Sequence, residues 1–325
     1  MRYRKLGRTG LEVSELGYGA WGIGADMWSG STDAEALAAL RRALEAGVNF
    51  FDTAYVYGDG HSEELIAQAF KAAGRRAFVA TKVPPKNSSW IASHRIEDAF
   101  TPEWIVSCTE RSLKKLSVER VDVQQLHTWT DDWLGQPGFD DVVSALDKLK
   151  QGGKIRFWGV SIKARHPNSA LGLARSGLPD TMQVVFNLFE QEPQGELFPL
   201  CREKDIGVIA RVPFDEGGLT GRLREDAAFP EGDFRHSYFA GRYLAETVRR
   251  AKELEKRLVG GDTPDLAHAA LRFCLSAPEV STVIPGMRTP AHVDANAAVT
   301  RLPPYPAQTL KELSAHAWKR DLAPA

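Results

Sequence analysis

Short, nearly continuous apolar runs alternate along the chain with longer stretches in which apolar residues recur every three or four positions. Short apolar runs are typical of parallel β-strands whose outer faces are covered by helices. Such runs predict eight strands, at residues 15–19, 48–52, 77–82, 121–127, 157–161, 182–186, 207–212 and 281–285.

The longer stretches between these runs have the pattern of amphipathic helices. Residues 33–46 are an example, because Thr32 and Glu35 have the spacing of a capping box and Gly47 is a typical stop. Further helices are predicted at residues 62–73, 102–116, 140–150, 167–176, 197–204, 244–258 and 264–275.

Eight strands with intervening helices in 325 residues favour an α/β fold of the (β/α)8 TIM-barrel type, formed by one domain over residues 1–325. A hairpin at residues 2–6 and 11–13 is expected before the barrel, and a helical segment at its C-terminal end. Alternation alone does not close a barrel, so a doubly wound sheet stays an alternative. Residues 222–243 are polar and predict a long loop, a kind of segment that is often a functional lid.

The chain carries 41 basic and 42 acidic residues, with a formal net charge of −1. Without a basic excess, neither a nucleic acid nor an anionic membrane is an expected partner. Cys108, Cys201 and Cys274 lie far apart, which argues against a disulfide framework and fits a reducing compartment. The N-terminus lacks the apolar core of a signal peptide and no run reaches the length of a membrane helix, so a cytoplasmic location is expected.

Four of the predicted strands end on a polar or ionisable residue, namely Asp52, Lys82, His127 and Ser161. In a parallel barrel, the carboxyl ends of the strands meet at the mouth where the chemistry takes place. A single residue of this kind is more often a solvated turn residue or a structural side chain. Together they predict a mouth that combines an acid, an ammonium, an imidazole and a hydroxyl, with Tyr57 on the loop that follows Asp52.

Gly17, Gly19 and Gly22 match the GxGxxG pattern of dinucleotide-binding folds. That fingerprint requires a helix that opens at the glycines and an acidic residue about 20 positions later. The next helix is predicted only near Thr32, so the pattern does not indicate a Rossmann fold. The sequence contains no GxxxxGK[ST] phosphate loop, no HExxH or CxxC motif and no GxSxG motif, and no metal site is predicted.

Seven segments, in order along nearly the whole chain, resemble the aldo-keto reductase superfamily. They are DTAYVYG at 52–58, ATK at 80–82, QLH at 125–127, GVS at 159–161, QVVFNLFEQ at 183–191, GLTG at 218–221 and VIPGMRTPAHVDAN at 283–296. The resemblance is to the bacterial stress-protein-like and potassium-channel β-subunit-like branches. It implies a (β/α)8 barrel that binds a nicotinamide cofactor without a Rossmann domain and reversibly reduces aldehydes or ketones to alcohols.

The resemblance places the family's catalytic tetrad on Asp52, Tyr57, Lys82 and His127. Tyr57, directly before a glycine, would donate the proton, whereas Tyr55 would line the pocket or pack. A phenol with a pKa of about 10 is protonated at neutral pH, and a nearby ammonium lowers the cost of giving up its proton. His127 would orient the carbonyl oxygen or relay the proton, and Asp52 would hold Lys82 in place.

The same resemblance favours NADP(H) over NAD(H), because Arg288 could pair with a 2′-phosphate. Ser161 and Gln183 match positions that hold the carboxamide, although Ile162 stands where the family often has asparagine. Arg211 replaces the usual aromatic residue under the nicotinamide ring. The remaining cofactor positions are Gly19, Trp21, Val212, Pro213, Phe214, Leu219, Gly221, Gly286, His292 and Asn296.

Trp21, Trp90 and Trp129 are the expected walls of a pocket for a small carbonyl or alcohol substrate, because aromatic walls suit an apolar carbonyl or a sugar face. A cofactor-binding regulatory subunit with little turnover stays an alternative, since channel β-subunits keep the tetrad. A hydrolase on the same barrel is less favoured, because no paired acidic residues stand at neighbouring strand ends. The sequence indicates neither the natural substrate nor the oligomeric state.

Overall fold

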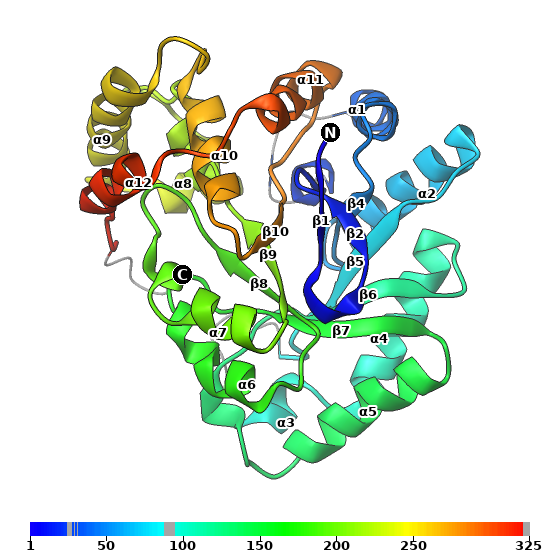
Figure 1. Ribbon diagram of the computed structural model, residues 1–325. Helices are drawn as coiled ribbons and strands as arrows, with labels where there is room; N and C mark the ends of the chain where they lie inside the picture. The colour runs from blue at the N-terminus through cyan, green and yellow to red at the C-terminus, as the bar shows by residue number, and fades with distance from the viewer. Residues whose placement is uncertain (25–27, 29, 31, 88–94, 321–325) are drawn as a thin grey trace.

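The fold is described by a computed structural model that covers residues 1–24, 28, 30, 32–87 and 95–320. Within these residues, eight parallel strands form one sheet in chain order (Figure 1). They are β3 (Tyr18–Gly19), β4 (Phe50–Asp52), β5 (Phe78–Val83), β6 (Val121–Leu126), β7 (Ile155–Ser161), β8 (Thr181–Val185), β9 (Gly207–Arg211) and β10 (Val280–Val283). Each strand overlaps one of the predicted apolar runs.

Backbone hydrogen bonds close this sheet into a barrel. The N–H of Gly17 donates to the carbonyl oxygen of Val283 at 2.8 Å, and the N–H of Gly19 donates to that of Pro285 at 3.0 Å. In return, the N–H of Val283 donates to the carbonyl oxygen of Glu15 at 2.8 Å. The (β/α)8 barrel prediction is therefore confirmed, and the doubly wound alternative is wrong, because an open sheet would leave these two edges unjoined.

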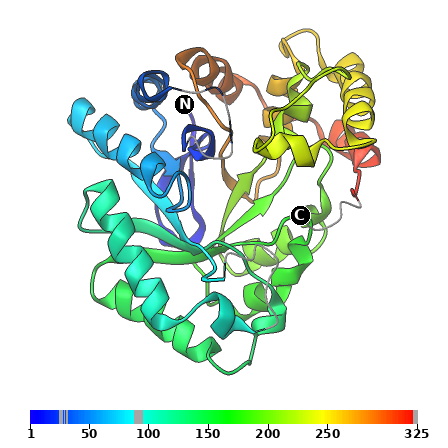
Figure 2. The same cartoon turned by 180° about the vertical axis from the view of Figure 1, so that it is seen from behind.

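Helices surround the strands and cover the outer face of the barrel (Figures 1 and 2). Thr32 and Glu35 form the predicted capping box at the start of α1, and Gly74 ends α2 in the left-handed conformation. The helices around the barrel are α1 (Asp33–Glu45), α2 (His61–Ala73), α4 (Pro102–Leu116), α5 (Phe139–Gln151), α6 (Leu171–Ser176), α7 (Leu197–Glu203), α10 (Leu266–Ser276) and α11 (Pro290–Ala298).

The remaining helices lie outside this repeating pattern. They are α3 (Ile96–Ala99), α8 (Phe234–Tyr238), α9 (Tyr243–Leu258) and α12 (Ala307–Leu313). The polar stretch 222–243 is thus not wholly irregular, because it contains α8. The expected C-terminal helical segment is α12, which an ion pair between Arg257 and Glu312 joins to α9. Over the described ranges, no helix combines the length and apolar composition that a membrane crossing requires.

Strands β1 (Tyr3–Lys5) and β2 (Glu12–Ser14) form the predicted antiparallel hairpin, which closes the amino-terminal end of the barrel. Gly7 allows the close approach, because its φ is 48° and a Cβ there would lie 2.3 Å from the backbone nitrogen of Gly207. Apolar side chains of the hairpin pack on the barrel interior in one cluster, which contains Leu6, Leu11, Val13, Phe50, Ala80, Val123 and Ile209. The hairpin does not cover the opposite end of the barrel, where the carboxyl ends of the strands lie and where a ligand-binding site is expected.

In β4, β5, β6 and β9, the side chains on the inner face of the barrel change from apolar to polar over two residues. Side chains alternate between the two faces of a strand, so residues two apart point the same way. The apolar members Phe50, Ala80, Val123 and Ile209 are followed two positions later by Asp52, Lys82, Gln125 and Arg211. This polar layer forms the floor of the candidate site.

Candidate active site

Lys82 is the centre of the polar layer. Its buried ammonium donates to Asp52 Oδ2 at 2.6 Å and to the carbonyl oxygen of Thr53 at 2.8 Å. A third contact joins Lys82 Nζ to the hydroxyl of Tyr57 at 3.3 Å. A phenol, an ammonium and a carboxylate from three predicted positions therefore lie within hydrogen-bond reach of one another through Lys82.

Two side-chain amides hold the second oxygen of Asp52. Gln183 Nε2 donates to Asp52 Oδ1 at 2.7 Å, and Gln125 Nε2 donates to the same oxygen at 3.2 Å. Gln125 lies in the QLH segment at 125–127, but only His127 of that segment was predicted as a site residue. Its signal is its position two residues before His127, because residues two apart on a strand point to the same face.

Tyr57 reaches the barrel mouth from the turn that follows β4. This turn requires Gly58, whose φ is 66° and whose Cβ, if present, would lie 2.1 Å from a neighbouring backbone carbonyl oxygen. The Tyr57 ring stands edge-on to His127, with 5.8 Å between ring centroids. Tyr55 lies elsewhere, with its ring centroid 5.5 Å from the Arg111 guanidinium carbon. The phenol in the site is therefore that of Tyr57.

Burial and neighbouring charges set the protonation of these groups. Burial alone would lower the pKa of Lys82, but the charges of Asp52 and Tyr57 and the hydrogen bonds to both residues together outweigh it, so the pKa is raised and the amine stays charged. Burial raises the pKa of the Tyr57 phenol, and this effect exceeds the opposing effect of the Lys82 charge. Burial, with the charges of Lys82 and Arg211, holds the pKa of His127 well below its usual range. At neutral pH the site presents a neutral phenol and a neutral imidazole beside an ammonium.

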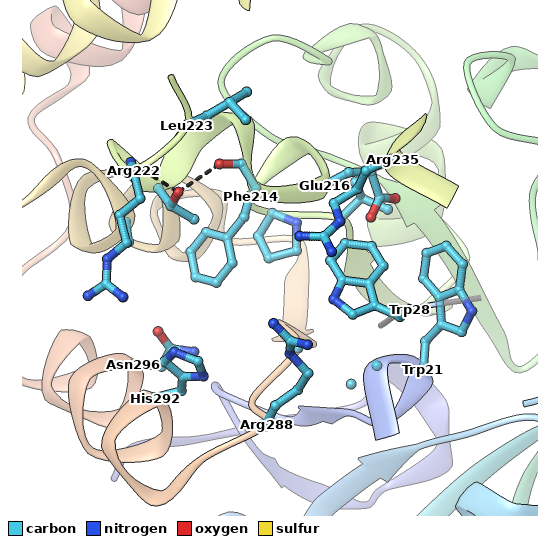
Figure 3. A pocket seen from close by; sticks show the side chains of 18 of the residues that line it. Trp21, Trp28, Phe214, Glu216, Arg222, Leu223, Arg235, Arg288, His292 and Asn296 are labelled. Atoms are coloured by element: carbon cyan, nitrogen blue, oxygen red, sulfur yellow. Dashed lines mark hydrogen bonds between the residues drawn. The ribbon is translucent and has the colours of Figure 1, made fainter. Parts of the chain in front are cut away.

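A cavity of about 570 Å³ opens above the polar layer and is partly drawn in Figure 3. Its volume lies within the range of about 300–1,000 Å³ that is typical of small-molecule sites. Asp52 and Tyr57 line its floor. The predicted cofactor residues that line it are Gly19, Trp21, Gln183, Arg211, Val212, Pro213, Phe214, Gly286, Arg288, His292 and Asn296.

Three predicted cofactor residues are not among those that line the cavity. Leu219 is fully buried in the core beneath the loop after β9, so its role is packing and the expected contact with a ligand is wrong. Gly221, with a φ of 73°, forms the turn that ends this loop. Ser161 lies at the end of β7, 3% exposed, and pairs in register with Gln183. Leu219 and Gly221 therefore contribute to the conformation of the loop and do not line the cavity.

The three tryptophans predicted to line a substrate pocket have different outcomes. Trp21 lines the cavity, and its ring centroid lies 6.3 Å from that of Tyr57. The prediction for Trp129 is wrong, because its side chain is 1% exposed and packs in the core with its centroid 5.6 Å from that of Trp133. A residue that follows a strand can turn toward the mouth or onto the surrounding helices, and Trp129 turns onto the helices. Trp90 lies outside the described residues.

The cavity wall also contains charged residues that the sequence patterns do not mark. They are Glu216, Arg222, Arg224, Asp226, Arg235, Asp265 and His268. The Arg235 guanidinium carbon lies 4.5 Å from the Trp28 ring centroid, and Arg235 pairs with Asp233 at 2.7 Å. Most of these residues come from the loop segments between β9 and α9, where no periodicity indicates which side chains face inward.

Arg222, His292 and Asn296 lie at the end of the cavity away from Trp21, and Arg288 lies between this end and the two tryptophans (Figure 3). Burial lowers the pKa of His292, and the nearby charges of Arg288 and Arg222 lower it further. Burial also lowers the pKa of Arg288, and the charge of Arg235 acts in the same direction. The guanidinium groups of Arg288 and Arg222 near one imidazole create a positive potential that attracts an anionic group.

The closed barrel, with its reactive groups at the carboxyl ends of the strands, places the chain among the (β/α)8-barrel enzymes. Comparison with known families specifies the class further, because the aldo/keto reductase family matches residues 15–317. The chain belongs to the aldo/keto reductase family, a family of oxidoreductases that act on carbonyl compounds.

Known proteins are similar to this chain over nearly its full length. Aldo-keto reductase YhdN of Bacillus subtilis is 29% identical, over 92% of this chain and 89% of its own length. A probable voltage-gated potassium channel subunit beta of Arabidopsis thaliana is 30% identical, over 91% and 90%. The NADH-specific methylglyoxal reductase of Escherichia coli is 27% identical, over 93% and 94%. The structure of the glycerol dehydrogenase AKR11B4 from Gluconobacter oxydans superposes with a TM-score of 0.78, at 27% identity, over 99% and 98%.

Proposed function

We propose that the chain is an NADP(H)-dependent oxidoreductase that reversibly reduces aldehydes or ketones to alcohols, with Tyr57 as the proton donor. The observation that carries this proposal is the 3.3 Å contact between the Tyr57 hydroxyl and Lys82 Nζ at the floor of the cavity. Asp52 holds Lys82 at 2.6 Å. A proton donor and a compensating positive charge therefore meet where an oxyanion would develop during carbonyl reduction.

The residues of the cavity fit a nicotinamide dinucleotide. Arg211 belongs to the polar layer, and its η-nitrogen donates to the carbonyl oxygen of Ile162 at 3.1 Å. The buried Nε of Arg211 has no hydrogen-bond partner among the described residues, so one donor of this cavity residue is left unsatisfied. The planar guanidinium can also stack against a flat ring, the role that an aromatic residue has elsewhere in the family. Since the side chain of Ile162 carries no polar atom, Ser161 and Gln183 are the side chains left to bind a carboxamide.

In the proposed reaction, the bound reduced nicotinamide supplies the hydride that is added to the carbonyl carbon. Tyr57 is protonated at neutral pH and gives its proton to the carbonyl oxygen as negative charge develops there. The Lys82 ammonium stabilises the phenolate that remains, and Asp52 keeps that ammonium in place. Neutral His127, edge-on to Tyr57, can hydrogen-bond the same oxygen and orient it. In the reverse direction the Tyr57 phenolate accepts the proton of the alcohol.

The preference for NADP(H) rests on the positive end of the cavity. Arg288 and Arg222 both lie close enough to His292 to lower its pKa. Two guanidinium groups beside one imidazole suit a doubly charged phosphate, which Arg binds through paired hydrogen bonds. Family membership alone leaves the choice open, because one relative is named for its specificity for NADH.

Fluorescence titrations with NADPH and NADH, followed by initial rates on a panel of aldehydes and ketones, test the proposal. NADPH is expected to bind more tightly than NADH, and at least one carbonyl compound is expected to be turned over steadily. A purified protein that binds neither cofactor would overturn the proposal. Tight binding without turnover on the whole panel would favour a regulatory subunit instead, a function supported by the similarity to a probable potassium channel subunit.

A further inference from the structure

The loop after β9, residues 212–221, has a strained backbone. Val212, Asp215 and Glu216 have φ values of 57°, 50° and 54°, in the left-handed region that residues other than glycine rarely adopt. Such strain persists only where the surrounding structure fixes it, and it is concentrated at ligand clamps and switch regions. The members of this loop that line the cavity are Val212, Pro213, Phe214, Glu216, Gly217 and Thr220.

Asp215 is the buried charged residue of this loop, and it binds side chains from other parts of the protein. Its Oδ1 accepts a hydrogen bond from the Tyr238 hydroxyl of α8 at 2.6 Å. Its Oδ2 accepts from the Arg320 guanidinium, in an ion pair whose two side chains are each 1% exposed. Arg320 also donates to Thr247 Oγ1 of α9 at 3.1 Å. Helix α8 and the C-terminal segment therefore bind one carboxylate of the loop, and α9 binds the arginine that pairs with it.

Arg320 itself is enclosed by aromatic rings. Its guanidinium carbon lies 4.6 Å from the Trp318 ring centroid and 4.8 Å from that of Tyr238. The backbone N–H of Trp318 donates to the carbonyl oxygen of Phe189 at 2.8 Å, which fixes the segment that carries Arg320. A buried charge is costly unless it is paired, so Arg320 and Asp215 compensate each other. Arg320 is not among the residues that line the cavity, and it acts on the cavity through Asp215.

We propose that Arg320 is a positioning residue for cofactor binding: through Asp215 it fixes the loop in the strained conformation that holds the dinucleotide. This inference rests on the proposed function. Without Arg320, Asp215 keeps its hydrogen bond from Tyr238 but loses its charged partner. The loop then spends part of its time in relaxed conformations that move Phe214 and Glu216 out of the cavity wall. The apparent affinity for the cofactor falls by the fraction of molecules that keep the competent conformation.

The substitution Arg320→Met tests the proposal, because methionine fills much of the same space without charge. Lys319→Met is the matched control, since Lys319 is the exposed neighbour of Arg320 on the same segment. In the purified full-length protein, Arg320→Met is expected to raise the Kd for NADPH about tenfold or more. The value of kcat at saturating NADPH is expected to stay within about threefold of wild type, because Tyr57 and Lys82 lie on other elements. Lys319→Met is expected to bind NADPH as the wild type does.

Two milder variants keep the test decisive if Arg320→Met does not fold. Arg320→Lys keeps the charge but loses the planar guanidinium that packs against the rings of Trp318 and Tyr238, so it is expected to bind with intermediate affinity. Asp215→Asn removes the charge on the other side of the pair and is expected to weaken NADPH binding. Added to Arg320→Met, it should cause little further loss, because both changes break the same interaction.

An unchanged Kd for NADPH in folded Arg320→Met, or in both Arg320→Lys and Asp215→Asn, would overturn the inference. A lower kcat at an unchanged Kd would also overturn it, because the effect would then lie on the chemical step. The wild-type titration separates this failure from a failure of the proposed function. If the wild type binds neither NADPH nor NADH, the proposed function is wrong; if wild type and variants bind equally, the inference about Arg320 alone is wrong.

Discussion

Replacing Lys82 with methionine tests whether the centre of the site is an ion pair that is stable only as a pair. The substitution leaves the Asp52 carboxylate buried, with its side chain 4% exposed. Removing one partner of a buried pair costs about 3–5 kcal/mol in the free energy of unfolding. Asp52 keeps two amide donors, Gln183 at 2.7 Å and Gln125 at 3.2 Å. We therefore expect a loss at the lower end of that range, about 3 kcal/mol.

The double variant Asp52→Asn with Lys82→Met removes both charges at once. It is expected to be more stable than Lys82→Met alone, because no uncompensated charge stays buried. Lys115→Met is the matched control. It breaks the pair between Lys115 and Glu64, which are 2.7 Å apart but lie at the surface, and so it should change stability little.

Urea unfolding followed by tryptophan fluorescence measures these differences, and circular dichroism on the same samples checks that the two transitions coincide. The expected order of stability is wild type and Lys115→Met first, then the double variant, then Lys82→Met. The reasoning would be refuted if Lys82→Met unfolded at the wild-type urea concentration. It would also be refuted if the double variant were the least stable of the four proteins.

Three further predictions concern the reaction, the cofactor and the dependence on pH. Tyr57→Phe is expected to lower kcat by roughly 100- to 10,000-fold with an unchanged Kd for NADPH, while Tyr55→Phe keeps its activity; a fully active Tyr57→Phe enzyme would end the assignment. Arg288→Gln is expected to raise the Kd for NADPH about 10- to 100-fold and to leave that for NADH nearly unchanged, and equal losses for both cofactors in fluorescence titrations would contradict a 2′-phosphate contact. The depressed pKa of His127 means that the unfolded chain, with a histidine pKa of about 6.5, takes up a proton that the folded protein does not. Stability should therefore fall as the pH drops below about 6.5, and His127→Gln should reduce the slope of this part of the urea-midpoint profile without abolishing it, because the pKa values of His166, His292 and His316 are lowered as well; an unchanged slope would contradict a buried neutral imidazole.

The barrel and the floor of its site could be predicted from the sequence because both follow from local periodicity. An apolar run that ends on Asp52 or Lys82 marks the point where a buried strand reaches the barrel mouth. Since strand side chains alternate, a polar residue two positions after an inward apolar one also points inward. That rule places Asp52 above Phe50 and Lys82 above Ala80. The closure of the barrel needed the structure, because it depends on hydrogen bonds between the first and last strands.

The predictions that failed concern the direction of side chains outside the strands and contacts between distant segments. Trp129 follows a strand directly, but nothing in its neighbours fixes whether the ring turns toward the mouth or onto Trp133. Arg222 and Arg235 lie in a stretch without periodicity, so no pattern separates them from solvated arginines. The ion pair between Arg320 and Asp215 joins residues 105 positions apart, a separation that no local pattern covers.

Charge along the cavity determines which way a dinucleotide would lie in it. At the floor, Asp52 compensates Lys82, and Glu216 lies near enough to Arg211 to favour its charged form. The other end carries Arg288 and Arg222. Burial and the charges of these two arginines lower the pKa of His292. The phosphate-bearing part of a dinucleotide is therefore attracted to the end with Arg288, which leaves the nicotinamide at the polar layer.

The loop of residues 212–221 forms part of the cavity wall between these two ends. This position explains why a change in its conformation would affect cofactor binding more than the rate of proton transfer. If the loop relaxes, Tyr57 and Lys82 keep their places on the floor, and Arg288 keeps its place on the segment after β10. What changes is the contact between the loop of residues 212–221 and the bound dinucleotide, which extends from one end of the cavity to the other. A ligand held at two ends loses affinity when the wall between them is populated in several conformations, whereas the groups that transfer the proton stay preorganised. Loss of the Asp215–Arg320 pair should therefore raise the Kd for the cofactor without lowering kcat, because this pair holds the loop and not the groups that transfer the proton.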